Sequence, residues 1–125
     1  MLTQPYVASI ASDGETALMY FDGAYSHAIR KGALLEGAAE QACDVRRAQA
    51  IAARTARADE LAVGAIALAA LEGPAPLYAR VDLVRDEAGR PRVLELELAE
   101  PSLYFDYGSG SAERFAARVL ARLAA

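Results

Sequence analysis

The stretch YARVDLVRDEAGRPRVLELELAEP, residues 78–101, decides the fold. It contains two segments that favour β-strand, Tyr78–Val84 and Arg92–Leu98, because both are rich in Val and Leu. The loop between them contains Gly89, as expected of a hairpin. Acidic residues nevertheless interrupt both strands, so we predict a hairpin with one polar and one apolar face.

Alternation of side chains along a strand assigns the charged residues of this hairpin to one face. Arg80 and Asp82 share that face in the first strand, and Glu95 and Glu97 share it in the second. A turn centred on the glycine places Asp82 opposite Glu95 and Arg80 opposite Glu97. The other, buried face then carries Leu94, Leu96 and Leu98.

Two carboxylates opposite each other repel, so something must offset the pairing of Asp82 with Glu95. Solvent is one explanation, with Arg80 screening the charges on a wet face. A divalent cation is the other, because Mg²⁺ takes hard oxygen ligands, which Asp82, Glu95 and Glu97 could supply while Arg80 holds a phosphate oxygen. With no His or Cys in the cluster, such a site suits Mg²⁺ or Mn²⁺ and not zinc.

The rest of the chain predicts strands and helices in the order strands, helix, strands, helix. Asp22-Gly23 predicts a hairpin of Thr16–Phe21 with Ala24–Arg30. Helices are expected from about residue 58 to 72 and from about 112 to 123, the second with Ser111 as N-cap. Residues 2–11 favour a short extended segment, and residues 33–54 leave helix and loop open. This order predicts an α+β fold, an antiparallel β-sheet with helices on one face.

Composition limits the class of protein. The chain has 125 residues, of which 54% are apolar, enough for one domain with a modest core. The net charge of −4 argues against a nucleic-acid binder, which usually presents a basic face. No apolar run reaches the length of a membrane span. The single cysteine, Cys43, cannot form an internal disulfide, which fits a cytoplasmic location.

Several segments resemble the ATP-grasp superfamily, which includes glutathione synthetase and D-alanine–D-alanine ligase. They are LYARVDLV, GRPRVLELELAEPSLYF and TQPYVASIASDGETALMYFDGAYSHAIRKG. The family carries Arg-x-Asp on one strand and Glu-x-Asn or Glu-x-Glu on the next, which here are Arg80, Asp82, Glu95 and Glu97. The resemblance covers residues 3–32 and 60–123 and is nearest to a bacterial subgroup of uncharacterised proteins and cycloserine-type ligases. It favours the metal over the solvent explanation.

The resemblance also implies a role for each matched position. Asp82, Glu95 and Glu97 would bind Mg²⁺ or Mn²⁺, and Arg80 would contact phosphate or the reaction intermediate as the catalytic residue. The remaining roles concern ATP: Gln4, Tyr6 and Val7 near adenine, Glu15 at the ribose, and Lys31, with Arg30 beside it, at phosphate or substrate.

The function that the resemblance implies is an ATP- and Mg-dependent ligase, which joins a carboxylate to an amine or thiol through an acylphosphate. Complete members have N-terminal lobes with phosphate-binding lysines. We therefore expect residues 1–125 to form a partial ATP-grasp domain, its C-terminal nucleotide- and metal-binding part. Such a fragment alone would be inactive, with a missing N-terminal lobe or a second copy as its partner. The alternative is a non-catalytic remnant that acts as a small binding or assembly module.

His27, the only histidine, has the ordinary pKa of a general base near pH 7. The family has no fixed catalytic histidine, however, so a hydrogen-bonded strand residue is the favoured interpretation. Three aromatic residues after Pro101 could shape a substrate pocket, but packing against the last helix is favoured: Tyr104, Phe105 and Tyr107.

Overall fold

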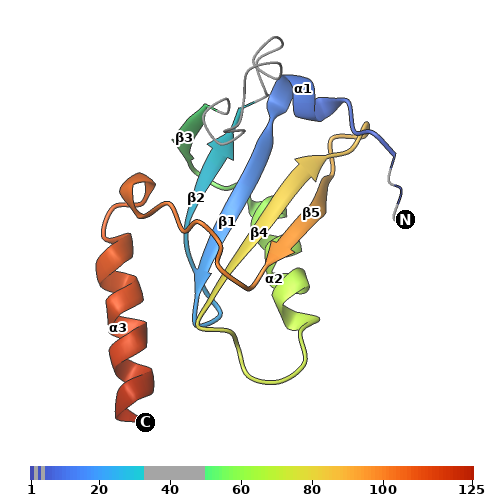
Figure 1. The fold of residues 1–125 in the computed structure, drawn as a ribbon. Helices are drawn as coiled ribbons and strands as arrows, with labels where there is room; N and C mark the ends of the chain where they lie inside the picture. The colour runs from blue at the N-terminus through green and yellow to red at the C-terminus, as the bar shows by residue number, and fades with distance from the viewer. Residues whose placement is uncertain (2, 4, 33–49) are drawn as a thin grey trace.

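The computed structural model describes residues 1, 3, 5–32 and 50–125. Within them, five strands form one antiparallel sheet in the order β3-β2-β1-β4-β5 (Figure 1). The strands are β1 (Glu15–Phe21), β2 (Ala24–Lys31), β3 (Ile51–Arg54), β4 (Tyr78–Arg85) and β5 (Pro91–Glu97). The helices are α1 (Ser9–Asp13), α2 (Ala58–Ala69) and α3 (Ser111–Ala124), with a 3-10 turn η2 (Phe105–Tyr107). The predicted α+β class with an antiparallel sheet is confirmed.

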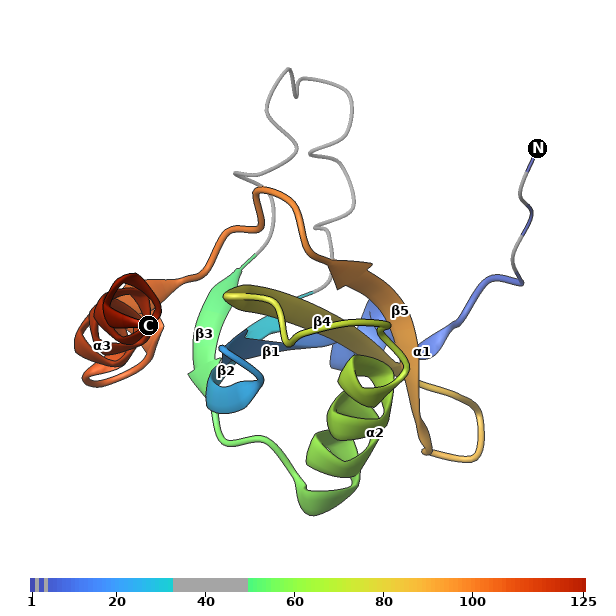
Figure 2. The same ribbon diagram turned by 90° about the horizontal axis from the view of Figure 1, so that it is seen from below.

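The two longer helices lie on opposite faces of the sheet, which corrects the prediction that the helices cover one face. Helix α2 covers one face (Figure 2), where Leu18 and Tyr20 of β1 pack against Val63 and its neighbours. Helix α3 reaches the other face near its N-terminus, where the Phe115 ring packs 5.1 Å from the Phe21 ring. The face opposite α2 is therefore covered only in part, and this is where charged residues gather.

The two predicted hairpins form, and their turns explain why. Asp22 and Gly23 both have positive φ, 53° and 78°, as a tight two-residue turn requires. In the second hairpin Arg80 pairs with Glu97 and Asp82 with Glu95, which confirms the predicted register. A bulge follows Asp82, so that Leu83 pairs with Val93.

Several boundaries differ from the prediction. Residues 9–13 form the short helix α1 where an extended segment was expected, and residues 51–54 form the strand β3. Ser111 is not the N-cap of α3: Gly110 is, and the Ser111 hydroxyl donates instead to the Phe105 carbonyl at 2.7 Å. Leu98 was expected to be buried but is 39% exposed, because β5 ends at Glu97.

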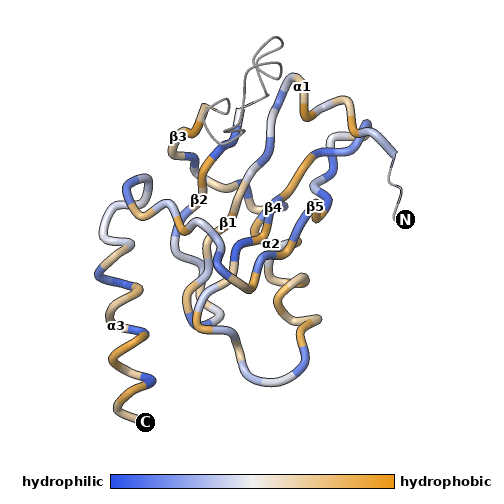
Figure 3. Tube along the Cα trace, viewed as in Figure 1, coloured by the Kyte–Doolittle hydropathy of each residue, from blue (hydrophilic) through white to orange (hydrophobic). Residues whose placement is uncertain are grey.

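Helix α3 buries few of its apolar side chains, and those nearest its C-terminus are exposed. Hydrophobic and hydrophilic residues alternate along it (Figure 3), yet Leu120 and Leu123 are exposed while Phe115 and Val119 are half-buried. Near its end Arg122 pairs with Asp22 of the β1–β2 turn at 2.5 Å. Every helix in the described part of the chain is too short or too polar to cross a membrane.

Candidate functional site

The candidate site lies on the sheet face opposite α2, where four strands each contribute charged side chains. Strand pairing sets Ala17 between Ile29 and Asp82, so that the odd-numbered residues of β1 and the residues His27, Ile29 and Lys31 of β2 share this face with Arg80 and Asp82. A pocket of about 380 Å³ opens there, lined by Lys31, Ile51, Arg80, Glu97, Glu100, Ser102 and Tyr104. Four of these seven side chains are basic or acidic, namely Lys31, Arg80, Glu97 and Glu100, so the pocket suits a polar or charged ligand.

Asp82 is the centre of the charged cluster. It is 1% exposed, and Lys31 Nζ lies 2.5 Å from its Oδ2. Arg80 donates from Nε to Oδ1 at 2.8 Å and from Nη2 to Oδ2 at 3.0 Å. Lys31 also lies 3.4 Å from Glu15 Oε2. Both cations are nearly buried, so the carboxylate is neutralised where water cannot screen it.

Arg80 joins the two predicted acidic strands to the segment that follows them. Its Nη2 lies 2.9 Å from Glu97 Oε1, and its Nη1 donates to the Ser102 carbonyl at 3.3 Å. The guanidinium carbon lies 5.9 Å from the centre of the Tyr104 ring, within cation–π range. Burial opposes the charged guanidinium, but the hydrogen bonds and charge of Asp82 outweigh burial and keep the pKa of Arg80 above its usual value.

Chemically, the carboxylates suit a hard divalent cation, because they offer only oxygen donors. In the arrangement present here, no three His, Cys, Asp or Glu side chains of the described residues stand close enough together to hold a metal ion. Both oxygens of Asp82 already accept from Arg80 or Lys31. Before Asp82 could bind a metal ion, Lys31 or Arg80 would therefore have to give up its hydrogen bond to this carboxylate. The metal-ligand roles remain predictions.

The other site residues predicted from the sequence form no hydrogen bond or ion pair with Lys31, Arg80 or Asp82 through their side chains, or lie outside the described residues. Glu95 pairs with Asp82 across the hairpin but is exposed. Tyr6 is 77% exposed and Val7 is half-buried before α1. Gln4 lies outside the described residues. Arg30 faces away from the site and donates to the Asp13 carbonyl at 2.7 Å.

His27 is a hydrogen-bonded strand residue, as predicted. Its Nε2 lies 3.0 Å from the Leu103 carbonyl and 3.1 Å from the Tyr104 carbonyl, and its Nδ1 lies 2.9 Å from Ser26 Oγ. Burial lowers its pKa, despite hydrogen bonds from the ring to the two carbonyls. The favoured packing role of the aromatic segment holds for Phe105, whose ring lies 5.6 Å from Phe115 of α3. It is wrong for Tyr104, which lines the pocket and contacts Arg80, and Tyr107 is 38% exposed.

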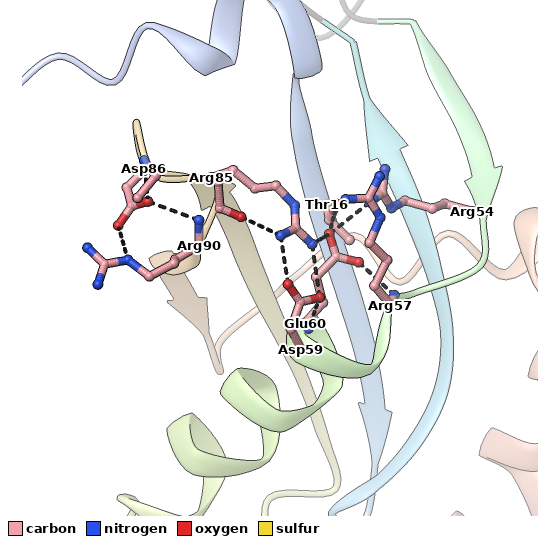
Figure 4. A network of polar contacts seen from close by, with 10 residues as sticks. Thr16, Arg54, Arg57, Asp59, Glu60, Arg85, Asp86 and Arg90 are labelled. Carbon is pink, nitrogen blue, oxygen red and sulfur yellow. Dashed lines mark hydrogen bonds and ion pairs between the residues drawn. The ribbon is translucent and has the colours of Figure 1, made fainter.

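A second polar network occupies the α2 face and was missed in the sequence (Figure 4). Glu60 is 1% exposed and accepts from Arg54 at 2.8 Å, from Thr16 at 3.2 Å and from the Arg57 backbone at 2.8 Å. Arg85 lies 3.1 Å from the same carboxylate. The helix expected from about residue 58 puts Glu60 in its first turn, where the helix dipole favours acids, and the sequence gives no further signal for this residue. Its side-chain contacts come from β1, β3 and β4, which the sequence pattern alone cannot bring together, and they hold α2 against the sheet.

Comparisons with known proteins agree on one group. No protein-family model matches the chain. The chain is 47% identical over 131 residues to cycloserine biosynthesis protein DcsG of Streptomyces lavendulae, covering 98% of this chain and 42% of that protein. The crystal structure of D-cycloserine synthetase DcsG matches 96% of this chain and 41% of its own, with a TM-score of 0.80 and 42% identity.

A more distant match concerns the fold alone. D-alanine–D-alanine ligase from Bacillus anthracis, solved in complex with ATP, matches 85% of this chain with a TM-score of 0.54 and 18% identity. The chain spans about two fifths of the length of DcsG and 36% of that ligase. The chain is therefore a homologue of part of D-cycloserine synthetase, and its resemblance to the ATP-grasp superfamily, in particular to the cycloserine-ligase-like subgroup, is confirmed.

Proposed function

We propose that this chain forms the C-terminal, nucleotide- and metal-binding part of an ATP- and Mg-dependent ligase that joins a carboxylate to an amine or thiol through an acylphosphate. The observation that carries the proposal is that Lys31 and Arg80 both line one pocket and both contact the buried carboxylate of Asp82. N-terminal lobes like those of complete ATP-grasp ligases would be needed for turnover. Formation of D-cycloserine is the first reaction to test, because DcsG is the matched relative.

Lys31 and Arg80 have the chemistry to bind the triphosphate. A guanidinium presents two parallel donors to phosphate oxygens, and an ammonium acts as a compact point charge. Both groups are already ordered by Asp82, so they lose little freedom on meeting a ligand. Arg80 and Lys31 would exchange part of their contact with Asp82 for phosphate, which would free that carboxylate.

The carboxylates would hold the cation. Asp82 and Glu97, which share Arg80 Nη2, would bind Mg²⁺ or Mn²⁺ together with Glu95 on the same hairpin. When bound, such a cation neutralises the charge that builds up as a phosphoryl group is transferred. Glu15 would reach the ribose, and Gln4, Tyr6 and Val7 would lie near adenine. The cytoplasmic location remains part of this proposal.

Binding of Mn²⁺ together with ADP tests the proposal on the chain itself. We expect the Glu95→Gln/Glu97→Gln double variant to lose Mn²⁺ binding, measured by proton relaxation in the presence of ADP. Glu113→Gln on α3, an exposed acid away from the site, is the matched control and should bind like wild type. Equal binding by the double variant and the control would refute the metal site and favour the alternative, a non-catalytic binding or assembly module.

Arg80 gives the test of catalysis, in a complete protein with its N-terminal lobes. Arg80→Ala should abolish most carboxylate-dependent ATP turnover, and Arg80→Lys should rescue it poorly because lysine lacks the planar pair of donors. Wild-type turnover by either variant would contradict the catalytic role.

A further inference from the structure

We infer that His27 is a positioning residue, which holds the segment Ser102–Tyr104 against the sheet and thereby sets the pocket wall that contacts Arg80. Nothing in the ATP-grasp resemblance assigns a role to this position. The inference deepens the proposed function, and its bearing on ligand binding rests on that function.

The hydrogen bonds of the His27 ring fix its tautomer. Carbonyl oxygens only accept, so Nε2 must carry the hydrogen that is shared between Leu103 and Tyr104. Nδ1 is then free to accept from the Ser26 hydroxyl, which itself lies 3.2 Å from Arg114 Nε of α3. His27 is 7% exposed, so its ring is a buried donor held in one orientation from the middle of β2.

The turn after the held segment closes tightly over the same ring. A Cβ built at Gly108 would lie 2.4 Å from His27 Cγ, far inside contact distance. The centre of the His27 ring also lies 6.1 Å from the centre of the Phe21 ring. Glycine is the only residue that permits this approach. The segment from Ser102 to Gly108 therefore contacts the His27 ring twice, through the Leu103 and Tyr104 carbonyls and again at Gly108.

The held carbonyls adjoin the groups that touch Arg80. The Ser102 carbonyl accepts from Arg80 Nη1, and the Tyr104 ring lies against its guanidinium. Tyr104 also has a φ of 49°, a left-handed conformation that is unfavourable for a residue with a side chain. The His27 hydrogen bond to the Tyr104 carbonyl offsets this strain, so its loss should release Tyr104 from Arg80.

Two substitutions separate the donor from the bulk of the ring. The amide nitrogen of His27→Gln can reach the position of Nε2 and donate to the two carbonyls, whereas His27→Asn is too short. The readout is the ¹⁵N NMR signal of Arg80 Nε–H, which donates to Asp82 and lies near the Tyr104 ring, and which Arg80→Lys would identify by its disappearance. We expect His27→Asn to shift this signal and speed its hydrogen exchange by roughly tenfold, the effect of one lost hydrogen bond, and His27→Gln to restore both.

An unchanged Arg80 signal in folded His27→Asn would overturn the inference. Equal disturbance by the Asn and Gln variants would also overturn it, because the donor would then not matter. Affinity for ADP with Mn²⁺ should follow the same order: wild type, then Gln, then Asn. A wild-type chain that binds no ADP with Mn²⁺ would refute the proposed function, while the NMR signals would still decide the role of His27.

Discussion

Lys31 Nζ lies 2.5 Å from Asp82 Oδ2, and both residues are almost fully buried. The carboxylate that resembles the metal ligand of the ATP-grasp ligases is thus held by an ammonium of the same chain. A buried cation and a metal ion compete for one carboxylate, because each neutralises the same charge. If Asp82 binds a metal ion and Lys31 binds phosphate, as proposed, we expect this contact to make the two binding events dependent on each other.

Replacement of Lys31 by methionine should therefore have opposite effects on two ligands. Free Mn²⁺ should bind more tightly to Lys31→Met, since the competing charge is gone, while ADP with Mn²⁺ should bind more weakly, since a phosphate contact is lost. Titration followed by Mn²⁺ electron paramagnetic resonance measures both affinities. Lys31→Arg keeps the charge and should resemble wild type in the absence of nucleotide. Unchanged affinity for free Mn²⁺ in Lys31→Met would show that Lys31 does not compete at Asp82.

Asp82 and Glu95 face each other across the hairpin but should differ in their contribution to stability. Asp82→Asn leaves Lys31 and Arg80 buried with less compensating charge, and breaking a buried pair of this kind costs about 3 kcal/mol. Glu95→Gln changes an exposed side chain and should alter the free energy of unfolding by less than about 0.5 kcal/mol. Urea denaturation of the two variants gives the comparison, and similar losses would contradict the buried position of Asp82.

Gly64 in α2 should resist replacement by alanine, although alanine favours a helix by about 1 kcal/mol. A Cβ at this position would lie 2.2 Å from the Tyr20 hydroxyl and 2.7 Å from Leu18 Cδ1. We expect Gly64→Ala to destabilise the protein by about 1–3 kcal/mol through overpacking. Tyr20→Phe removes the nearer atom, so the double variant should lose less than Gly64→Ala alone. A thermal melt that shows Gly64→Ala to be stabilising would contradict the close packing of α2 on β1.

Much of the β4–β5 hairpin could be predicted from the sequence, because it depends on residues that are close together in the chain. Alternation of charged and apolar residues predicts the shared face of Arg80 and Asp82, and a turn centred near Gly89 predicts their partners Glu95 and Glu97. The bulge after Asp82, which offsets the pairs nearer the turn by one residue, has no signal in the sequence pattern. The comparison with DcsG then supports the family that these residues indicated.

The rest could not be predicted, because it depends on contacts between distant segments. The strand β3 has four residues and exists through its pairing with β2, and α1 has five residues without an apolar stripe. The contact of Lys31 with Asp82 joins residues 51 positions apart through the intervening strand β1. No spacing rule places Lys31 beside Asp82 until the order of the strands is known.

His27 gives the protein a pH dependence whose direction follows from its environment. Burial lowers the pKa of His27 below its usual 6.5. Among the described residues, the polar groups around the ring are Ser26, two carbonyls and the cationic Arg114, none of them a carboxylate that would raise this pKa. A lowered pKa means that the unfolded chain takes up the proton first. The stabilisation is therefore complete above pH 6.5 and declines as the pH falls from 6.5 towards the folded-state pKa, with a slope of at most about 1.4 kcal/mol per pH unit.

Because the chain has one histidine, His27→Gln should make the free energy of unfolding nearly flat between pH 7.5 and the range where carboxylates titrate, measured by urea denaturation at each pH. The same decline in His27→Gln as in wild type would assign the pH dependence to another group.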